Sequence, residues 1–144
     1  MKRRITVEQL QELTPKQLQI LSKQWKPTDL DIAIDDIGGE NIIFPIKIED
    51  GKIYEWPHLE EEINNQKYKL CEIRKECILP LLDIGQMIEL LDQHNEINPI
   101  CIERNEKSVI GGFEWMVRLN NTLNMKQINA SLCDALWQAV KQVL

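Results

Sequence analysis

The 144-residue sequence contains no long apolar run, and positive charge is scarce in it relative to negative charge. No stretch approaches the ~20 apolar residues that a membrane helix requires, and the basic start, Lys2 to Arg4, leads into a polar amphipathic segment instead of a signal-peptide core. We therefore expect a cytoplasmic protein that binds no membrane. The formal charge of −6 opposes general binding to nucleic acid. We expect the basic start to be solvated.

Cysteine is also scarce. Cys71, Cys77, Cys101 and Cys133 have neither the paired spacing of zinc ligands nor the density of a disulfide scaffold, so we expect free or buried thiols. Ser131 and Cys133 lack a nearby histidine in the sequence, and apolar helix positions surround Cys133. This pattern favours structural roles over nucleophilic ones.

Metal and phosphate motifs are missing as well. His58 lies near the acidic run Glu60, Glu61 and Glu62, and His94 stands at a predicted helix end, but adjacency in sequence does not make ligands converge. A histidine at a helix C-terminus complements the helix dipole, and an acidic run is usually a solvated face. We predict no catalytic residue, no metal site and no cofactor.

The sequence does contain four tryptophans, each in a different predicted element. Trp25 ends a helix, Trp56 closes a hairpin, Trp115 lies in a strand and Trp137 lies in the last helix. Such large rings anchor cores or interfaces. They indicate a packed domain without naming its task.

Helix-start signals open the chain. Thr6 with Gln9, and Thr14 with Gln17, have the spacing of capping boxes. Together with the apolar positions that follow, they predict a helical hairpin over residues 6–25.

The spacing of apolar residues then changes to the two-residue period of a strand. Leu30, Ile32 and Ile34 alternate with polar or small residues, which predicts one buried face. The segment 57–69 has weak signals and is expected to be a helix or a loop.

A hairpin is predicted between these two segments. Residues 42–48 are rich in β-branched residues, Asp50-Gly51 is a strong turn signal, and residues 52–56 supply the returning strand. Pro45 cannot donate to a sheet ladder, so we expect the first arm to be an edge or irregular strand.

The second half begins with an extended stretch that enters Pro80. Asp83 and Gln86 form another capping pair, which predicts a helix ending near His94. A second hairpin follows, with its turn at Asn105-Glu106.

The later arm of that hairpin places four apolar residues on one side, namely Phe113, Trp115, Val117 and Leu119. Leu132, Leu136, Trp137 and Val140 recur at helical spacing, and we expect this last helix to dock on the sheet that carries Trp115. With no repeat or linker, the sequence predicts a single compact α+β domain over residues 1–144, with an N-terminal helical hairpin, a small antiparallel sheet or hairpins, and a docked C-terminal helix.

Two stretches resemble a known group. Residues 77–91 (CILPLLDIGQMIELL) and 132–144 (LCDALWQAVKQVL), with Trp25-Lys26-Pro27, are similar to small uncharacterised proteins encoded in phages and prophages of Firmicutes. The resemblance implies a phage or mobile-element setting and a bacterial cytoplasm. It transfers no functional residue.

The acidic surface, the aromatic residues and the absence of a site motif favour a non-enzymatic protein-interaction module acting on a host or phage protein. Tyr54 and Trp56 share one face of a predicted edge strand, with Glu55 and Glu60–Glu62 as an acidic rim, and are the candidate partner-binding residues. Because large aromatic residues are highly buried on average, burial of either ring against the domain's own core is favoured over exposure. The alternative function is an enzyme whose acidic and histidine residues converge from distant positions.

Overall fold

The computed structural model describes residues 1–35, 41–56, 61–63, 66–68, 72–94, 100–106, 113–119, 126–129 and 131–144. Its contacts form two compact units, one made of Met1–Gln17 and Leu82–Leu144 and the other of Leu18–Leu81. Helices and antiparallel sheets occur in both, which confirms the predicted α+β class. One domain over residues 1–144 stays a prediction. Among the described helices, none is long and apolar enough to span a membrane.

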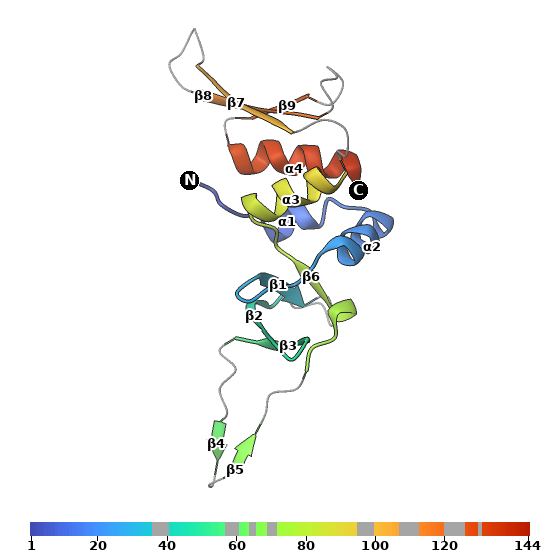
Figure 1. Cartoon of the computed structure of the whole chain (residues 1–144), viewed down its shortest axis with the longest axis vertical. Helices are drawn as coiled ribbons and strands as arrows, with labels where there is room; N and C mark the ends of the chain where they lie inside the picture. Colours follow the sequence, from blue (N-terminus) through green and yellow to red (C-terminus); the bar gives the residue numbers. More distant parts are fainter. Residues whose placement is uncertain are drawn as a thin grey trace. The chain divides into compact units, whose positions relative to one another are not determined.

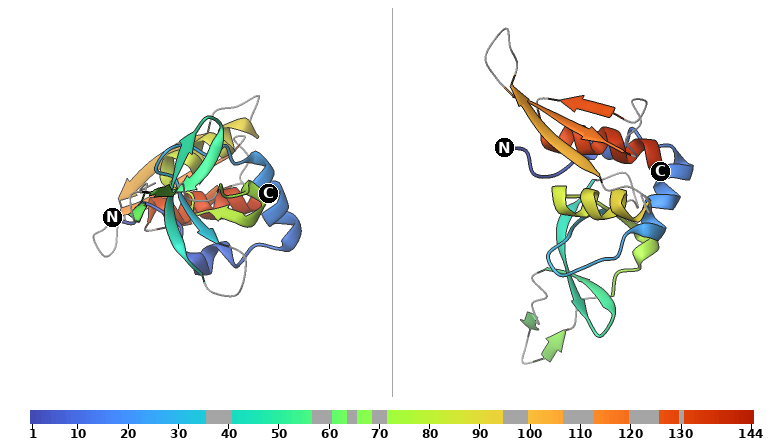
Figure 2. Two further views of the ribbon diagram at one scale, coloured as in Figure 1. Left: turned by 90° about the horizontal axis from the view of Figure 1, so that it is seen from below. Right: turned by 45° about the horizontal axis from the view of Figure 1, so that its top comes forward.

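The first unit contains α1 (Val7–Leu10), α3 (Ile84–Gln93), α4 (Leu132–Val143), β7 (Cys101–Glu106), β8 (Phe113–Arg118) and β9 (Lys126–Asn129). The strands form one antiparallel sheet in the order β7-β8-β9. Helix α4 packs on β8 and β9 and also contacts α3, so it lies between the sheet and α3 (Figures 1 and 2). The predicted docking of the last helix is confirmed.

Contacts on both sides explain why α4 is so deeply buried. Its fully buried residues are Cys133, Ala135, Leu136, Trp137, Ala139 and Val140. They lie around much of the helix circumference, which one packed face could not cover. The helix begins at Ser131, whose Oγ accepts the backbone N–H of Asp134 at 3.3 Å.

Helix α3 has the predicted start and end. The Asp83 carboxylate accepts the Gln86 N–H at 2.8 Å, and the Gln86 side chain accepts the Asp83 N–H at 2.9 Å. His94 is the C-cap. The capping boxes of Thr6 with Gln9 and of Thr14 with Gln17 are made in the same reciprocal way, at the starts of α1 and α2 (Pro15–Gln24).

The second hairpin forms, but its turn is not at Asn105-Glu106. Both residues belong to β7, where Asn105 pairs with Glu114 and Glu106 pairs with Phe113. The connection falls within residues 107–112, outside the described part. Asparagine favours turns locally, and here cross-strand pairing carries the strand past it. Strand β9 was not predicted.

The second unit contains the rest of α2 with β1 (Ile32–Asp35), β2 (Ile43–Glu49), β3 (Lys52–Glu55), β4 (Glu61–Ile63), β5 (Gln66–Tyr68), the short 3₁₀ helix η1 (Lys75–Cys77) and β6 (Ile78–Pro80). Four strands form an antiparallel sheet in the order β3-β2-β1-β6. The buried residues of its core are Trp25, Ala33, Phe44, Ile46, Ile53 and Ile78. The extended stretch predicted to enter Pro80 is confirmed only for β6, because η1 occupies the three residues before it.

Strand β1 starts later than predicted. Leu30 has a positive φ of 68° and is 58% exposed, so it belongs to a turn and not to a buried face. Ala33 and Ile34 are the buried residues of the strand. The turn arises because Asp31 donates its N–H to the Thr28 carbonyl and turns its carboxylate inward.

The buried carboxylate of Asp31 links this turn to the core. It accepts the Trp25 indole N–H at 3.1 Å and the Thr28 backbone N–H at 2.9 Å, and the Thr28 hydroxyl lies 2.9 Å from its other oxygen. These bonds compensate the cost of burying an acidic group. They also satisfy the indole of Trp25, which is buried.

The first hairpin has the predicted turn. Asp50 and Gly51 both have positive φ, as a two-residue connection of this kind requires. The prediction that Pro45 makes β2 an edge strand is wrong, because β2 is paired on both sides. Pro45 lies beyond the last paired residue of β3, and its carbonyl accepts the Trp56 N–H at 2.8 Å. The missing donor therefore falls where the ladder ends.

The described part of the segment 57–69, residues 61–63 and 66–68, forms two short strands instead of the helix or loop that the sequence suggests. Strands β4 and β5 pair there, from Glu61 with Tyr68 to Ile63 with Gln66 (Figure 1). The predicted helix is already interrupted in the sequence by Asn64-Asn65, because asparagine is unfavourable in a helix interior, but no local signal indicates strands on either side. Residues 57–60 lie outside the described part.

We predict that Asp31→Ala lowers the free energy of unfolding by about 1–3 kcal/mol, because the Trp25 indole and the Thr28 N–H both lose their acceptor. Asp31→Asn keeps an acceptor oxygen and should lose less. Urea unfolding measures both variants. In a double-mutant cycle with Trp25→Phe, additive losses would contradict the coupling of the two side chains.

We predict that Trp137→Ala costs about 3–5 kcal/mol, because the fully buried ring leaves a cavity in the α4 layer. Trp137→Phe is the matched control. Among the residues that the structure describes, none accepts a hydrogen bond from the indole nitrogen, so phenylalanine removes a buried unpaired donor while it keeps most of the volume. Thermal unfolding compares the two, and an equal loss for both variants would show that ring volume is not what stabilises this layer.

Candidate functional site

The register of the first hairpin gathers a group of side chains on one sheet face. Lys47 pairs with Tyr54, and alternation along β2 and β3 places Ile43, Pro45 and Trp56 on the same side. We call these five residues the Trp56 surface. The opposite face of both strands points into the core of the second unit.

The Trp56 surface exposes apolar area. The Trp56 side chain is 42% exposed and that of Ile43 is 52% exposed. The Lys47 ammonium lies 5.7 Å from the centroid of the Trp56 ring, a cation–π contact. The Trp56 backbone N–H donates to the Pro45 carbonyl, which fixes the backbone at this residue, and the side chain stays partly exposed beside Lys47.

The partner-binding residues predicted from sequence therefore lie together. Tyr54 is half-buried and Trp56 is exposed, so neither ring is buried in the core. Strand β3 is at the sheet edge, as expected. Glu55 is exposed, but alternation places it on the other face from Tyr54. Lys47 was missed, although the hairpin register could have placed it opposite Tyr54.

The acidic rim stays a prediction. Glu60 lies outside the described residues, and Glu61 and Glu62 belong to β4, where side chains are not described.

The two histidines do not form a site in the described part of the chain. His94 is exposed at the end of α3, and its backbone N–H donates to the Leu91 carbonyl. His58 lies outside the described residues. Across the residues that are described, no group of three His, Cys, Asp or Glu side chains could hold a metal ion.

The cysteine thiols are free where they are described, at Cys77, Cys101 and Cys133. Burial raises the pKa of the Cys133 thiol, and the nearby charge of Lys2 lowers it by less. Thiolate formation is thus opposed at Cys133. With Ser131 acting as the cap of α4, both nucleophile candidates have structural roles.

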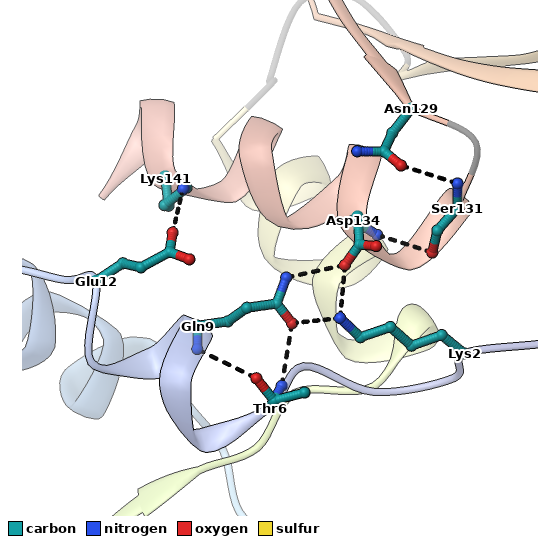
Figure 3. A network of polar contacts seen from close by, with 8 residues as sticks. All are labelled: Lys2, Thr6, Gln9, Glu12, Asn129, Ser131, Asp134 and Lys141. Atoms are coloured by element: carbon teal, nitrogen blue, oxygen red, sulfur yellow. Dashed lines mark hydrogen bonds and ion pairs between the residues drawn. The ribbon is translucent and has the colours of Figure 1, made fainter.

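A polar network holds the start of the chain to α4 (Figure 3). The Lys2 ammonium donates to an Asp134 carboxylate oxygen at 2.6 Å and to the Gln9 amide oxygen at 2.7 Å. The Gln9 amide nitrogen reaches the same Asp134 oxygen at 2.9 Å. Further along α4, the Lys141 ammonium forms an ion pair with the Glu12 carboxylate. The expectation that Lys2 is merely solvated is wrong, because this network fixes it.

Two further clusters on β7 and β8 were not found from the sequence. Arg118 donates to a Glu103 oxygen at 3.3 Å and to the Cys101 sulfur at 3.4 Å. Arg104 lies over the Phe113 ring. Both depend on which residues stand opposite one another, and the misplaced turn hid that register.

Comparison of the chain with protein-family models, curated proteins and solved structures finds no match.

We predict that acid weakens the link between Lys2 and Asp134. Burial raises the pKa of the Asp134 carboxyl, but hydrogen bonds from Lys2 and Gln9, the Lys2 charge and a hydrogen bond with Ser131 outweigh it, so the pKa is lowered overall. An aspartate in the unfolded chain titrates near about pH 3.9. The stabilisation is therefore present above that pH and is lost as pH falls through the lower pKa of the folded state.

The measurement is the free energy of unfolding of wild type and Asp134→Asn across this acid range. The difference between them should shrink as pH falls. Lys2→Gln removes the main compensating partner and should leave a weaker pH dependence. A constant difference between wild type and Asp134→Asn down to the lowest pH would contradict the lowered pKa.

Proposed function

We propose that this chain is a non-enzymatic protein-interaction module and that its partner contacts the Trp56 surface. The observation that carries the proposal is the partly exposed Trp56 ring, which lies against the Lys47 ammonium on a backbone that is bonded to Pro45. Tryptophan and tyrosine are enriched among the residues that contribute most to binding. An indole already held in position loses little side-chain entropy when a partner covers it.

The surroundings of Trp56 support a contact surface. Ile43 and Pro45 extend the apolar area along β2, and Lys47 with Lys52 and Glu49 supplies charged groups beside it. An apolar centre with a charged margin is the usual anatomy of a protein interface. In contrast, Trp25 and Trp137 are buried and are available only to the core.

The proposed partner is a host or phage protein in a bacterial cytoplasm. The resemblance of residues 77–91 and 132–144 to phage and prophage proteins supports this choice. The formal charge of −6 supports a protein partner over general nucleic-acid binding.

We predict that Trp56→Ala abolishes partner capture from bacterial lysate while the free energy of unfolding falls by less than the about 3–5 kcal/mol expected for a fully buried tryptophan, because the ring is 42% exposed. The exposed cation–π contact with Lys47 contributes about 0.5–1 kcal/mol of that loss. The measurement is affinity capture with mass spectrometry, alongside thermal unfolding of the same variant. Capture that is unaffected by the change, or lost only because the variant unfolds, would remove Trp56 from the interface.

Ile42 and Ile43 provide a matched pair of controls. They are neighbours with nearly equal exposure, 51% and 52%, but Ile43 is the first residue of β2, on the face that carries Trp56, whereas Ile42 lies outside the strand. Ile43→Ala should weaken capture of the same partner, and Ile42→Ala should leave it unchanged. Equal effects would indicate a general loss of apolar surface and not a specific contact.

A further inference from the structure

Arg104 and two aromatic rings form a stacked cluster on the sheet of the first unit. The Arg104 guanidinium carbon lies 3.5 Å from the centroid of the Phe113 ring and 5.9 Å from that of Trp115. The strand register accounts for this arrangement. Arg104 pairs directly with Trp115, and Phe113 precedes Trp115 by two residues, so all three side chains occupy one face of the β7-β8 hairpin.

The cluster is open to solvent at one end. Phe113 is 49% exposed and Arg104 is exposed, whereas Val117, further along the same face of β8, is fully buried. The exposed end therefore combines a large apolar ring with a cation. Arginine and large aromatic residues are enriched in the centres of protein interfaces.

The charge of Arg104 is not neutralised within the described part of the chain. Neither an ion pair nor a hydrogen bond to its guanidinium occurs among the described residues, although Glu106 lies two residues away on the same face. Arg118 differs, because Glu103 already pairs with it. The Phe113 ring covers one flat face of the Arg104 guanidinium, which leaves the N–H groups at its edge free to donate.

We propose that Arg104, Phe113 and Trp115 form a second interaction surface, which binds one carboxylate of an acidic peptide segment with an apolar residue beside it. A carboxylate matches the fork of guanidinium N–H groups and accepts two parallel hydrogen bonds. The neighbouring apolar side chain of the partner packs on the exposed Phe113 ring. This surface belongs to the first unit, and the proposal does not depend on a role for Trp56.

Charge complementarity favours a peptide carboxylate over nucleic acid. Binding to nucleic acid draws on several phosphate contacts made by several basic residues. Among the described residues the cluster offers one unpaired cation, and Glu106 lies two residues along β7 on the same face. One short-range anionic group suits such a surface, whereas a continuous phosphate backbone would also meet Glu106.

The test begins with a random dodecapeptide library displayed on phage, selected on the full-length protein and depleted on Arg104→Gln. Enriched sequences should carry Asp or Glu next to an apolar residue. One selected peptide is then labelled, and its Kd is measured by fluorescence anisotropy for each variant. Arg104→Gln and Phe113→Ala should each weaken binding by about tenfold or more, because the first removes charge-assisted hydrogen bonds and the second removes the apolar support.

Three controls separate recognition from general charge or misfolding. Arg74→Gln removes the same charge at an exposed position of the other unit and should leave Kd unchanged. Arg104→Lys keeps the charge but loses the paired donors, so it should also weaken binding while thermal unfolding stays as in the wild type. Replacing the acidic residue of the peptide by its amide should abolish binding.

The proposal is overturned by several outcomes. These are no enrichment over the depleted library, enriched peptides without an acidic residue, or equal affinity of wild type and Arg104→Gln. Labelled oligothymidylate is measured in parallel. Arg104-dependent binding of that oligonucleotide, with no binding of acidic peptides, would assign the surface to nucleic acid and refute the peptide proposal.

Discussion

Helix α4 carries apolar side chains around more of its circumference than a single packed face can cover. In the first unit, the sheet of β7, β8 and β9 covers one side and α3 contacts another, so Trp137 and its neighbours lose all contact with water. The first unit combines both ends of the chain, because α1 and the residues before it belong to it together with Leu82–Leu144. The bonds of Lys2 and Gln9 to Asp134 join these distant segments at the first turn of α4.

The second unit depends on a different constraint, which is the need to satisfy a buried carboxylate. Asp31 takes bonds from Trp25 and Thr28, and this arrangement turns the chain just before β1. Leu30 is left exposed in consequence, and the sheet ladder with β2 starts beside Asp31, whose carbonyl accepts the Ile46 N–H. A polar contact thus decides the start of a strand that apolar alternation places two residues earlier.

The tryptophans divide between these two kinds of environment. Trp25 and Trp137 are buried, while Trp56 and Trp115 are partly covered and each lies near a cation, Lys47 for Trp56 and Arg104 for Trp115. The partly exposed rings occur where a hairpin brings a basic residue opposite or near an aromatic one. The two proposed surfaces share this physical form, since a ring held by a cation stays ordered without being covered.

The sequence by itself determined the local features of this protein. Capping pairs such as Asp83 with Gln86 specify helix starts through bonds that span three residues, and Asp50-Gly51 specifies its turn through backbone preference alone. The apolar spacing of α4 was sufficient to predict that it docks on a sheet.

Only the tertiary structure decided which distant residues meet. Pro45 is tolerated in an interior strand because the pairing with β3 ends beside it. Asp31 is tolerated in a buried position because the Trp25 indole N–H donates a hydrogen bond to its carboxylate. The placement of Arg104 over Phe113 follows from a register that the turn signal at Asn105 misplaced. Side-chain alternation has a period of two, so pairing across strands, which is a non-local property, sets the composition of each face.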